Sequence, residues 1–270
     1  MVDASLIAYS PSLFGGNTVL TRQIESTWWQ TFYDDAMQVV LQDQSSDKIR
    51  SESALMCQLI GLETGQSVFD QCCGLGQHAM ELARMGFHVT GLDQSNDYIS
   101  SATGAAKAND LSVQFFTGDA LHTVLEQKVD AVINWHSSFG YCADDQSNLK
   151  MLCAAYESLK PSGKMLLEFP NMVHLLANFQ AIIETTLPCG TTLVRRSRIE
   201  MQDETLRQTW AYRFDDGTSR EHQSLMRIYL PTQITELLHS AGFTDIQLFA
   251  GDGDELSSDS PRLIALASRV

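Results

Sequence analysis

The stretch "VFDQCCGLGQHAMELARMGFHVTGLDQS" (residues 68–95) joins two apolar runs, each ending in an acid, through a glycine turn and a helix-like segment. Asp70 ends the first run and Asp93 ends the second. Gly74 and Gly76 allow a sharp turn and leave room for a ligand against the main chain. Because the following helix would direct free N–H groups at that ligand, and Asp93 can accept hydrogen bonds from ribose hydroxyls, the stretch predicts a nucleotide-binding unit.

Strand-like and helix-like segments continue to alternate along the chain. The strand-like segments are residues 67–70, 87–93, 113–120, 129–135 and 163–169. The helix-like segments between them are residues 78–86, 96–110 and 144–160. Such alternation is typical of βαβ units around a parallel sheet, with the loops that follow the strands along one ligand-binding edge. A helix at 231–243 and strands at 244–251 and 262–270 are expected to complete the sheet.

The flanking segments have other patterns. Residues 1–20 look irregular, and residues 21–41 place apolar side chains at helical spacing, which predicts an amphipathic helix. A second helix is expected over 47–62 and another over 171–184. Three strands of an antiparallel meander are predicted over 191–201, 205–214 and 220–230. In the middle strand, one face is expected to carry Leu206, Trp210, Tyr212 and Phe214.

The composition limits the expected partners. A net charge of -15 argues against nucleic acid or an anionic membrane surface, because both attract positive proteins. The arginines of "LVRRSR" (residues 193–198) fall in a strand-like stretch and are interpreted as a solvated strand face. No apolar run is long enough to span a membrane, and the N-terminus does not read as a secretory signal. The six cysteines form no C-x-x-C pair, which indicates reduced thiols, a cytoplasmic protein and no metal site.

The glycine turn alone leaves the ligand open. "GLGQHA" (residues 74–79) satisfies the relaxed dinucleotide pattern, so an NAD-dependent oxidoreductase has to be considered. The wider context differs from that pattern. "GDA" (residues 118–120) places an acid after the third strand, where it can meet an adenine amino group, and "NWHSSFGY" (residues 134–141) follows the fourth strand.

With these motifs the chain resembles the class I S-adenosylmethionine-dependent methyltransferases, from about Trp28 to Val270. Residues 69–95 are similar to the family's first two motifs, residues 115–120 to its adenine segment and residues 159–169 to its fifth-strand segment. The resemblance implies an α/β fold with a Rossmann-like, seven-stranded, mostly parallel sheet whose last strand is antiparallel. It is strongest with small-molecule enzymes, such as glycine and natural-product N-methyltransferases, that carry an N-terminal helical lid and an antiparallel insert.

The resemblance also implies a domain organisation and a reaction. The expected units are a lid at 1–48, a cofactor-binding core at 49–170, an antiparallel substrate cap at 171–230 and the completion of the core at 231–270. The implied cofactor is S-adenosylmethionine, and the implied acceptor is a small molecule methylated on nitrogen or oxygen. A cap of this kind can support a homodimer.

Individual residues take roles from the resemblance. Asp93 is expected to hold the ribose and Gln94 to lie beside the adenine, which Asp119 and Ala120 contact. Tyr33 and Arg50 are expected to close over the cofactor and hold its carboxylate. The full set of expected cofactor residues is Tyr33, Arg50, Asp70, Cys72, Gly74, Gly76, Asp93, Gln94, Asp119, Ala120 and Asn134.

His136 is the expected catalytic residue, in the loop after the fourth strand beside the cofactor methyl. An imidazole can remove the proton that the acceptor must lose, or it can be bonded to the loop and only orient the substrate, and both roles stay open. The expected substrate contacts are Trp29, Tyr141, Glu168, His174 and Tyr229.

Three other functions remain as alternatives. Besides the NAD-dependent oxidoreductase, these are a non-catalytic module that binds the cofactor without turnover and a nucleic-acid methyltransferase. The acidic charge disfavours the last of these, and "NWHS" differs from the "NPPY"-type turn of amino-group DNA methyltransferases.

Overall fold

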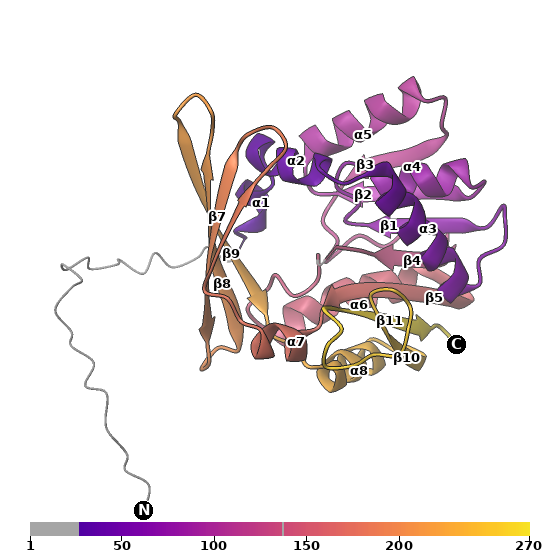
Figure 1. The fold of residues 1–270 in the computed structure, drawn as a ribbon. Helices are drawn as coiled ribbons and strands as arrows, with labels where there is room; N and C mark the ends of the chain where they lie inside the picture. Colours follow the sequence, from indigo (N-terminus) through magenta and orange to yellow (C-terminus); the bar gives the residue numbers. More distant parts are fainter. Residues whose placement is uncertain (1–26, 137) are drawn as a thin grey trace, which may run out of the picture.

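The computed structural model describes residues 27–136 and 138–270. The irregular segment expected at 1–20 and the first residues of the helix expected over 21–41 lie outside the described residues. Within the described part, the chain forms a large mixed sheet flanked by helices and a smaller antiparallel sheet beside it (Figure 1). None of the helices described there combines the length and the apolar character needed to cross a bilayer.

The larger sheet is seven-stranded in the described residues, with the order β10-β11-β5-β4-β1-β2-β3. Its strands are β1 (Ser67–Gln71), β2 (His88–Asp93), β3 (Val113–Thr117), β4 (Val129–Asn134), β5 (Leu159–Pro170), β10 (Thr244–Ala250) and β11 (Arg262–Ser268). Strand β1 pairs in parallel with both β2 and β4, whereas β11 runs antiparallel to both of its neighbours. The predicted parallel sheet with an antiparallel last strand is confirmed.

Helices cover both faces of this sheet, as its apolar strands require. They are α3 (Ser46–Ile60), α4 (Gln77–Arg84), α5 (Asn96–Ala108), α6 (Asp145–Ser158) and α8 (Pro231–Ser240). Adjacent residues of β1 point to opposite sides, so Phe69 packs in one core with Leu152 of α6 and Val68 packs in another with Leu82 of α4. The parallel strands therefore end at one shared edge, where Asp70 pairs with Gly91 of β2.

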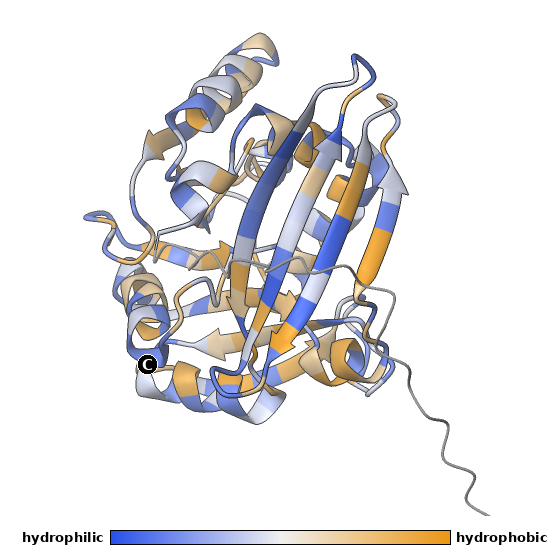
Figure 2. Cartoon of the chain, turned by 90° about the vertical axis from the view of Figure 1, so that its left-hand side faces the viewer, coloured by the Kyte–Doolittle hydropathy of each residue, from blue (hydrophilic) through white to orange (hydrophobic). Residues whose placement is uncertain are grey.

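The insert between β5 and α8 forms the second sheet. It consists of helix α7 (Met172–Ala177) and the strands β6 (Ile182–Thr186), β7 (Thr192–Glu200), β8 (Thr205–Arg213) and β9 (Ser219–Arg227). The helix expected over 171–184 is wrong beyond Ala177, because Ile182 and Ile183 belong to β6. Both are β-branched, and pairing with β7 uses their preference for strands. Figure 2 looks onto the outer side of this four-stranded sheet.

The expected single N-terminal helix is interrupted. The chain forms α1 (Trp29–Phe32) and α2 (Asp35–Gln42), separated at Asp34. The Asp34 carboxylate accepts hydrogen bonds from the backbone N–H groups of Ala36 and Met37, so it starts a new helix instead of continuing the first. Both short helices lie between the insert and the main sheet (Figure 1), and the ring of Phe32 packs edge-on against Trp210 of β8.

Candidate active site

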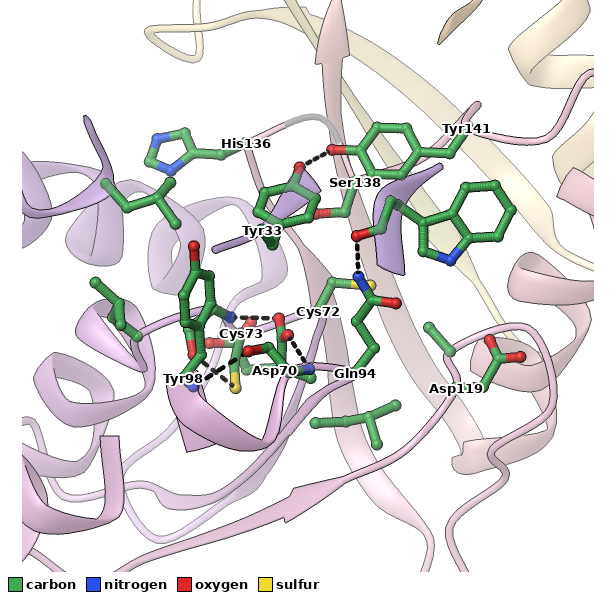
Figure 3. A pocket seen from close by; sticks show the side chains of 18 of the residues that line it. Tyr33, Asp70, Cys72, Cys73, Gln94, Tyr98, Asp119, His136, Ser138 and Tyr141 are labelled. Atoms are coloured by element: carbon green, nitrogen blue, oxygen red, sulfur yellow. Dashed lines mark hydrogen bonds between the residues drawn. The ribbon is translucent and has the colours of Figure 1, made fainter. Parts of the chain in front are cut away.

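A cavity of about 840 Å³ lies at the carboxyl edge of the larger sheet (Figure 3). Its volume is in the range of small-molecule and cofactor sites. The predicted cofactor residues that line it are Tyr33, Asp70, Cys72, Gly74, Asp93, Gln94, Asp119 and Ala120. The structure therefore brings together, in what we call the cofactor cavity, residues from the ends of β1 and β2, the loop after β3 and the N-terminal helices.

Asp93 is fixed by the main chain around it. Its Oδ2 accepts a hydrogen bond from the Gly74 N–H at 2.9 Å, and its Oδ1 accepts one from the Ser95 N–H at 2.9 Å. Burial raises the pKa of this carboxyl, and the backbone hydrogen bonds oppose the shift. Two backbone donors thus set the orientation of the carboxylate, which still has lone pairs available for a ribose diol.

The two glycines of the turn serve different purposes. Gly74 lines the cofactor cavity at a φ of 54°, and a Cβ there would meet nothing within 4 Å, so the main chain faces open space. Gly76 does not line the cavity. It begins α4 at a φ of 71°, where a Cβ would lie 2.5 Å from the ring of Phe115. Gly74 is therefore available to a ligand, whereas Gly76 is required for packing.

Gln71, the last residue of β1, holds the loop after β3 in place. Gln71 is buried, and its Nε2 donates to the carbonyl oxygens of Ala120 (3.3 Å) and Met151 (3.2 Å). Asn134, at the end of β4, is buried outside the cavity lining and donates from Nδ2 to Gln71 Oε1 at 3.3 Å. Within residues 27–136 and 138–270, the buried Oδ1 of Asn134 has no hydrogen-bond partner. Because Asn134 lies outside the lining, the groups here that a nucleoside cofactor can reach are the main chain at Gly74 and the Asp93 carboxylate.

A second cavity, of about 640 Å³, lies against the insert. Its lining includes residues of α1, α2, the inner face of β7–β9 and the end of β5. It shares four residues with the cofactor cavity: Tyr33, Leu41, His136 and Tyr141. We call it the acceptor cavity. The two spaces meet at these four side chains.

Two tyrosines stand at this meeting point. The hydroxyls of Tyr33 and Tyr141 are hydrogen-bonded to each other (Figure 3). Burial raises the pKa of both phenols well above the usual value, so both hydroxyls stay protonated at neutral pH. The pair links α1 to the loop after β4 and presents neutral hydroxyls to both cavities.

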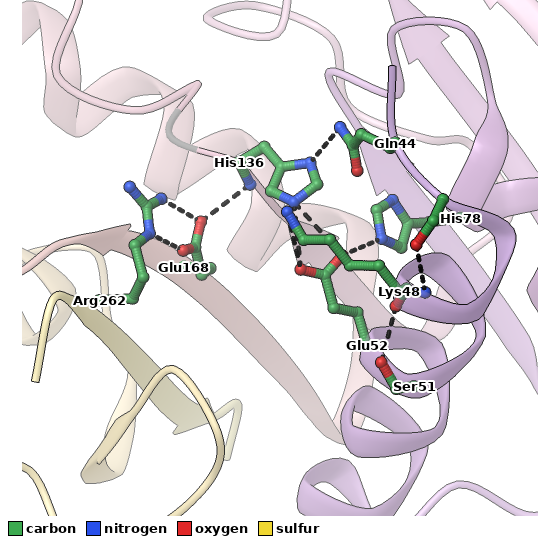
Figure 4. Close-up of polar contacts among 9 residues, drawn as sticks. Gln44, Lys48, Ser51, Glu52, His78, His136, Glu168 and Arg262 are labelled. Carbon is green, nitrogen blue, oxygen red and sulfur yellow. Dashed lines mark hydrogen bonds and ion pairs between the residues drawn. The ribbon is translucent and has the colours of Figure 1, made fainter. Parts of the chain in front are cut away.

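His136 is held at the same boundary from several directions (Figure 4). Its backbone has a φ of 60°, and its N–H donates to Glu168 Oε2 at 2.9 Å. Glu168 in turn pairs with Arg262 of β11. The ring nitrogens of His136 contact Glu52 Oε2 at 3.3 Å and Gln44 Nε2 at 3.4 Å. This network holds the loop in place. It also stabilises the left-handed backbone conformation of His136, which is strained for a residue other than glycine.

The predicted substrate contacts divide into two groups. Trp29 lines the cofactor cavity, His174 lines the acceptor cavity and Tyr141 lines both. Glu168 and Tyr229 line neither. Glu168 is buried under Arg262 and the His136 N–H, and Tyr229 is buried with its hydroxyl donating to Asp145 Oδ1 at 2.8 Å, so both are placed to support the structure.

Two arginines lie differently from the expectations. Arg50, expected at the cofactor carboxylate, is outside both cavity linings, with 64% of its side chain exposed and ion pairs to Asp47 and Glu81. The interpretation of residues 193–198 as a solvated face is wrong for Arg195. This side chain lines the acceptor cavity and lies over the ring of Trp210, 5.2 Å from its centroid. Strand alternation explains the difference, because Arg196 points the other way and is exposed.

Two polar residues of the site were not expected from the sequence. Glu52 of α3 contacts both His78 and His136, and Gln44 contacts His136. Their contacts join segments that are far apart in the chain. The pattern of charges on α3 is that of an ordinary solvated helix, so it gives no local signal for this role.

Comparison with known proteins agrees with this geometry. Residues 68–163 match the family model described as a methyltransferase domain. A putative methyltransferase from Geobacillus sp. (strain WCH70) is 25% identical over 213 residues, which are 77% of this chain and 86% of that protein. The glycine/sarcosine N-methyltransferase of Aphanothece halophytica is 24% identical over 213 residues, 78% of each chain.

Solved structures share the fold. The CcbJ methyltransferase from Streptomyces caelestis has a TM-score of 0.76 at 16% identity, covering 89% of this chain and 99% of that one. The sugar N-methyltransferase KedS8 from Streptoalloteichus sp. ATCC 53650 has a TM-score of 0.61 at 17% identity, covering 98% of both chains. With the matched domain spanning the glycine turn, Asp93 and the adenine segment, the chain belongs to the class I S-adenosylmethionine-dependent methyltransferases.

Proposed function

We propose that this enzyme transfers a methyl group from S-adenosylmethionine to the nitrogen or oxygen of a small molecule bound in the acceptor cavity. The observation that carries the proposal is the junction of the two cavities at Tyr33, Leu41, His136 and Tyr141. The printed names of the relatives support the class of acceptor, because they include a glycine/sarcosine and a sugar N-methyltransferase.

The residues of the cofactor cavity have complementary tasks in this proposal. When bound, S-adenosylmethionine would supply a methyl group on a sulfonium centre: the acceptor lone pair bonds to the methyl carbon, and the carbon–sulfur bond breaks with its electron pair left on the sulfur of S-adenosylhomocysteine. Asp93 accepts from the ribose, the main chain at Gly74 borders the methionine part, and Asp119 with Ala120 borders the adenine. Holding two reactants in line can supply roughly 7–11 kcal/mol of a barrier in well-oriented reactions.

The junction residues act on the acceptor. His136 takes the proton that the acceptor nitrogen or oxygen loses, or it orients the acceptor through the same ring nitrogen. The hydroxyls of Tyr33 and Tyr141 provide neutral hydrogen-bonding groups at the point of transfer. The α1 and α2 helices and the insert border this point, and each of these interactions is stronger where they exclude water.

The acceptor cavity also favours a particular chemistry in its ligand. Arg195 lines the cavity, and its buried Nε has no hydrogen-bond partner among the described residues. A buried guanidinium N–H without a partner is costly, and a carboxylate or phosphate of the ligand would satisfy it. We propose that the acceptor carries an anionic group that binds Arg195.

The test is an acceptor screen with formation of S-adenosylhomocysteine as the readout. Amine and hydroxyl metabolites are compared in pairs with and without a carboxylate. In the Arg195→Met variant the KM of the carboxylated acceptors is expected to rise about tenfold or more, the size of one charged hydrogen bond. Arg196→Met is the matched control, because it removes the exposed neighbour on the opposite face.

Two outcomes would contradict the proposal. Methylation of a nucleic acid or a protein, without methylation of any small molecule, would contradict the proposal that the acceptor is a small molecule. An equal change of KM in the two arginine variants would show that Arg195 does not bind the acceptor. The proposal of methyl transfer would still stand.

A further inference from the structure

Three side chains from three separate elements converge beside the cavity junction. They are Glu52 of α3, His78 near the start of α4 and His136 in the loop after β4 (Figure 4). One ligand-type atom from each lies within 4.8 Å of the other two. Glu52 lines neither cavity, so direct contact with a cofactor or an acceptor does not explain why it meets both histidines.

The spacing of these atoms is that of a coordination sphere. Glu52 Oε2 lies 2.9 Å from His78 Nε2 and 3.3 Å from His136 Nε2. Two ligand atoms that each bind one ion at about 2.0–2.2 Å lie roughly 3.0–3.5 Å apart in tetrahedral or octahedral geometry. His136 Nε2 also lies 3.4 Å from Glu52 Oε1, so both histidines direct Nε2 at the same carboxylate, at separations that ligands to one ion require. Lys48 contacts the other oxygen, Oε1, at 3.7 Å.

Gln44 provides an independent observation at the far side of His136. Its Nε2 is 3.4 Å from His136 Nδ1, while its buried Oε1 has no partner within the described residues. The nitrogen and oxygen of a glutamine amide can be exchanged by a half-turn. After that half-turn, Gln44 Oε1 accepts a hydrogen bond from the protonated Nδ1 of His136. The lone pair on Nε2 of His136 is then free to bind a metal ion. Metal-binding histidines are held by such an outer hydrogen bond.

We propose that Glu52, His78 and His136 form a binding site for a divalent transition metal ion of the Zn²⁺ type. Two imidazoles and one carboxylate suit Zn²⁺ and its neighbours, and three protein ligands leave at least one coordination position open. His78 and His136 line the cofactor cavity and His136 also lines the acceptor cavity, so an ion held by them would be reachable from the junction. The sequence-based expectation of no metal rested on the cysteines, and none of these ligands is a cysteine.

The role of the ion rests on the proposed function, whereas its binding does not. An acceptor hydroxyl that coordinates the ion loses its O–H proton to solvent at a lower pH than the free alcohol. The oxygen keeps the bonding electron pair and is the nucleophile for the methyl group. His136 then positions the acceptor as a ligand of the ion, which selects one of the two roles considered for it.

The first experiment measures metal binding alone. Metal-stripped protein without a histidine tag is titrated with Zn²⁺ by calorimetry and with Co²⁺ by visible absorbance. We expect one equivalent to bind, with the Co²⁺ bands of a nitrogen and oxygen site and without the near-ultraviolet band of thiolate coordination. No stoichiometric binding, or a thiolate band, would overturn the proposal and leave Glu52 as a hydrogen-bonding partner of the two histidines.

The second experiment locates the site. Glu52→Gln and His78→Gln are each expected to weaken Zn²⁺ binding at least 100-fold, and Gln44→Ala to weaken it about 10- to 100-fold. His88→Gln is the matched control, because His88 is exposed at the start of β2. Undiminished binding in both ligand variants would overturn the assignment of these residues.

The same proteins separate this inference from the proposed function. Binding of S-adenosylhomocysteine is measured in parallel and is expected to be similar in Glu52→Gln and His88→Gln, because neither residue lines the cofactor cavity. If the protein binds the metal but methylates no small molecule, the metal site is supported and the proposed small-molecule acceptor is refuted. Methyl transfer that is unchanged by complete metal removal would refute the catalytic role of the ion.

Discussion

The two cavities are built in different ways. The cofactor cavity is formed mainly by the ends of neighbouring parallel strands, with the N-terminal helices against them, and the Asp93 carboxylate in it is held by backbone groups such as the N–H of Gly74. The acceptor cavity is formed by segments that are far apart in the sequence. Its contacts are between side chains, such as the ring of Phe32 against Trp210 or the Tyr33–Tyr141 hydroxyl pair.

The two cavities therefore depend on the sequence in different ways. Backbone contacts at the end of a parallel sheet are fixed by the strand register, so the cofactor cavity is set by the fold itself. Side-chain contacts between the N-terminal helices and the insert depend on the identity of each residue. Substitutions on the cofactor side should therefore change affinity or folding, whereas substitutions at the junction should change turnover.

The largest effect is expected at the junction. His136→Ala should lower kcat by roughly 10²- to 10⁴-fold, the range for a group that removes the acceptor proton or, as a ligand of the proposed ion, promotes the loss of that proton. The affinity for S-adenosylhomocysteine should stay within a few-fold, because the side chain is not among those expected to hold the ribose or adenine. Initial rates and calorimetry check the two parts, with His88→Ala as the control. Unchanged turnover would exclude His136 from the chemistry, and a parallel loss of affinity would assign it to the cofactor.

The next effect tests the cofactor side. Asp93→Ala should weaken S-adenosylhomocysteine binding about 100-fold or more, since hydrogen bonds to a charged group contribute roughly 1.5–3 kcal/mol each. Asp259→Ala, in an exposed loop, is the control for a lost carboxylate. Equal affinities in the two variants would remove Asp93 from ribose binding. Titration of the unmodified enzyme with NAD should give no heat, and a response would bring back the dinucleotide interpretation of residues 74–79.

A pair of glycines tests the packing that underlies the cofactor side. Gly76→Ala should lower the free energy of unfolding by about 2–4 kcal/mol, because its Cβ would meet the Phe115 ring at an already left-handed φ. Gly104→Ala, inside α5 with open space around its Cβ, should instead raise it by up to about 1 kcal/mol. Urea unfolding measures both. If both substitutions changed the free energy of unfolding in the same direction, the contact with Phe115 would not be the reason why a glycine is required at position 76.

The comparison also explains which parts could be predicted from the sequence. The alternation of strands and helices and the placement of Asp93 and Asp119 follow local rules, and the structure places both acids in the cofactor cavity. The break at Asp34 and the strand β6 could not be predicted as easily. In both places a single residue or a pair of isoleucines changes the outcome within a segment whose wider pattern is helical.

The acceptor side could be predicted only in outline. Tyr141 and His174 were expected and line the acceptor cavity, but Glu168 and Tyr229 lie beneath it. Glu52 and Arg195 were missed because their roles depend on partners from other elements. The charge of Arg195 suggested solvent, and only its register opposite Trp210 in β7 and β8 turns it inward.

The stability of the empty cofactor cavity depends on the charge of Asp70. Burial raises the pKa of this carboxyl to about 7, with Asp93 adding to the shift and His78 opposing it. In the unfolded chain the value is about 3.9. Between these values the folded enzyme holds a proton that the unfolded chain has lost, so the free energy of unfolding should fall as the pH rises from about 4 to about 7.

Asp70→Asn removes this dependence while keeping the shape of the side chain. Without cofactor, the variant should be more stable than the parent at pH 8 by up to about 4 kcal/mol, and this advantage should largely disappear by pH 4. Urea unfolding at the two pH values measures the difference, and an advantage of equal size at both would show that ionisation is not its cause. Because a cationic ligand favours the ionised carboxyl, S-adenosylmethionine should stabilise the parent more than the variant at pH 8. The ionised Asp70 would then favour cofactor binding while lowering the stability of the empty enzyme. The hydroxyls of Tyr33 and Tyr141 at the junction are neutral and do not lower the stability in this way.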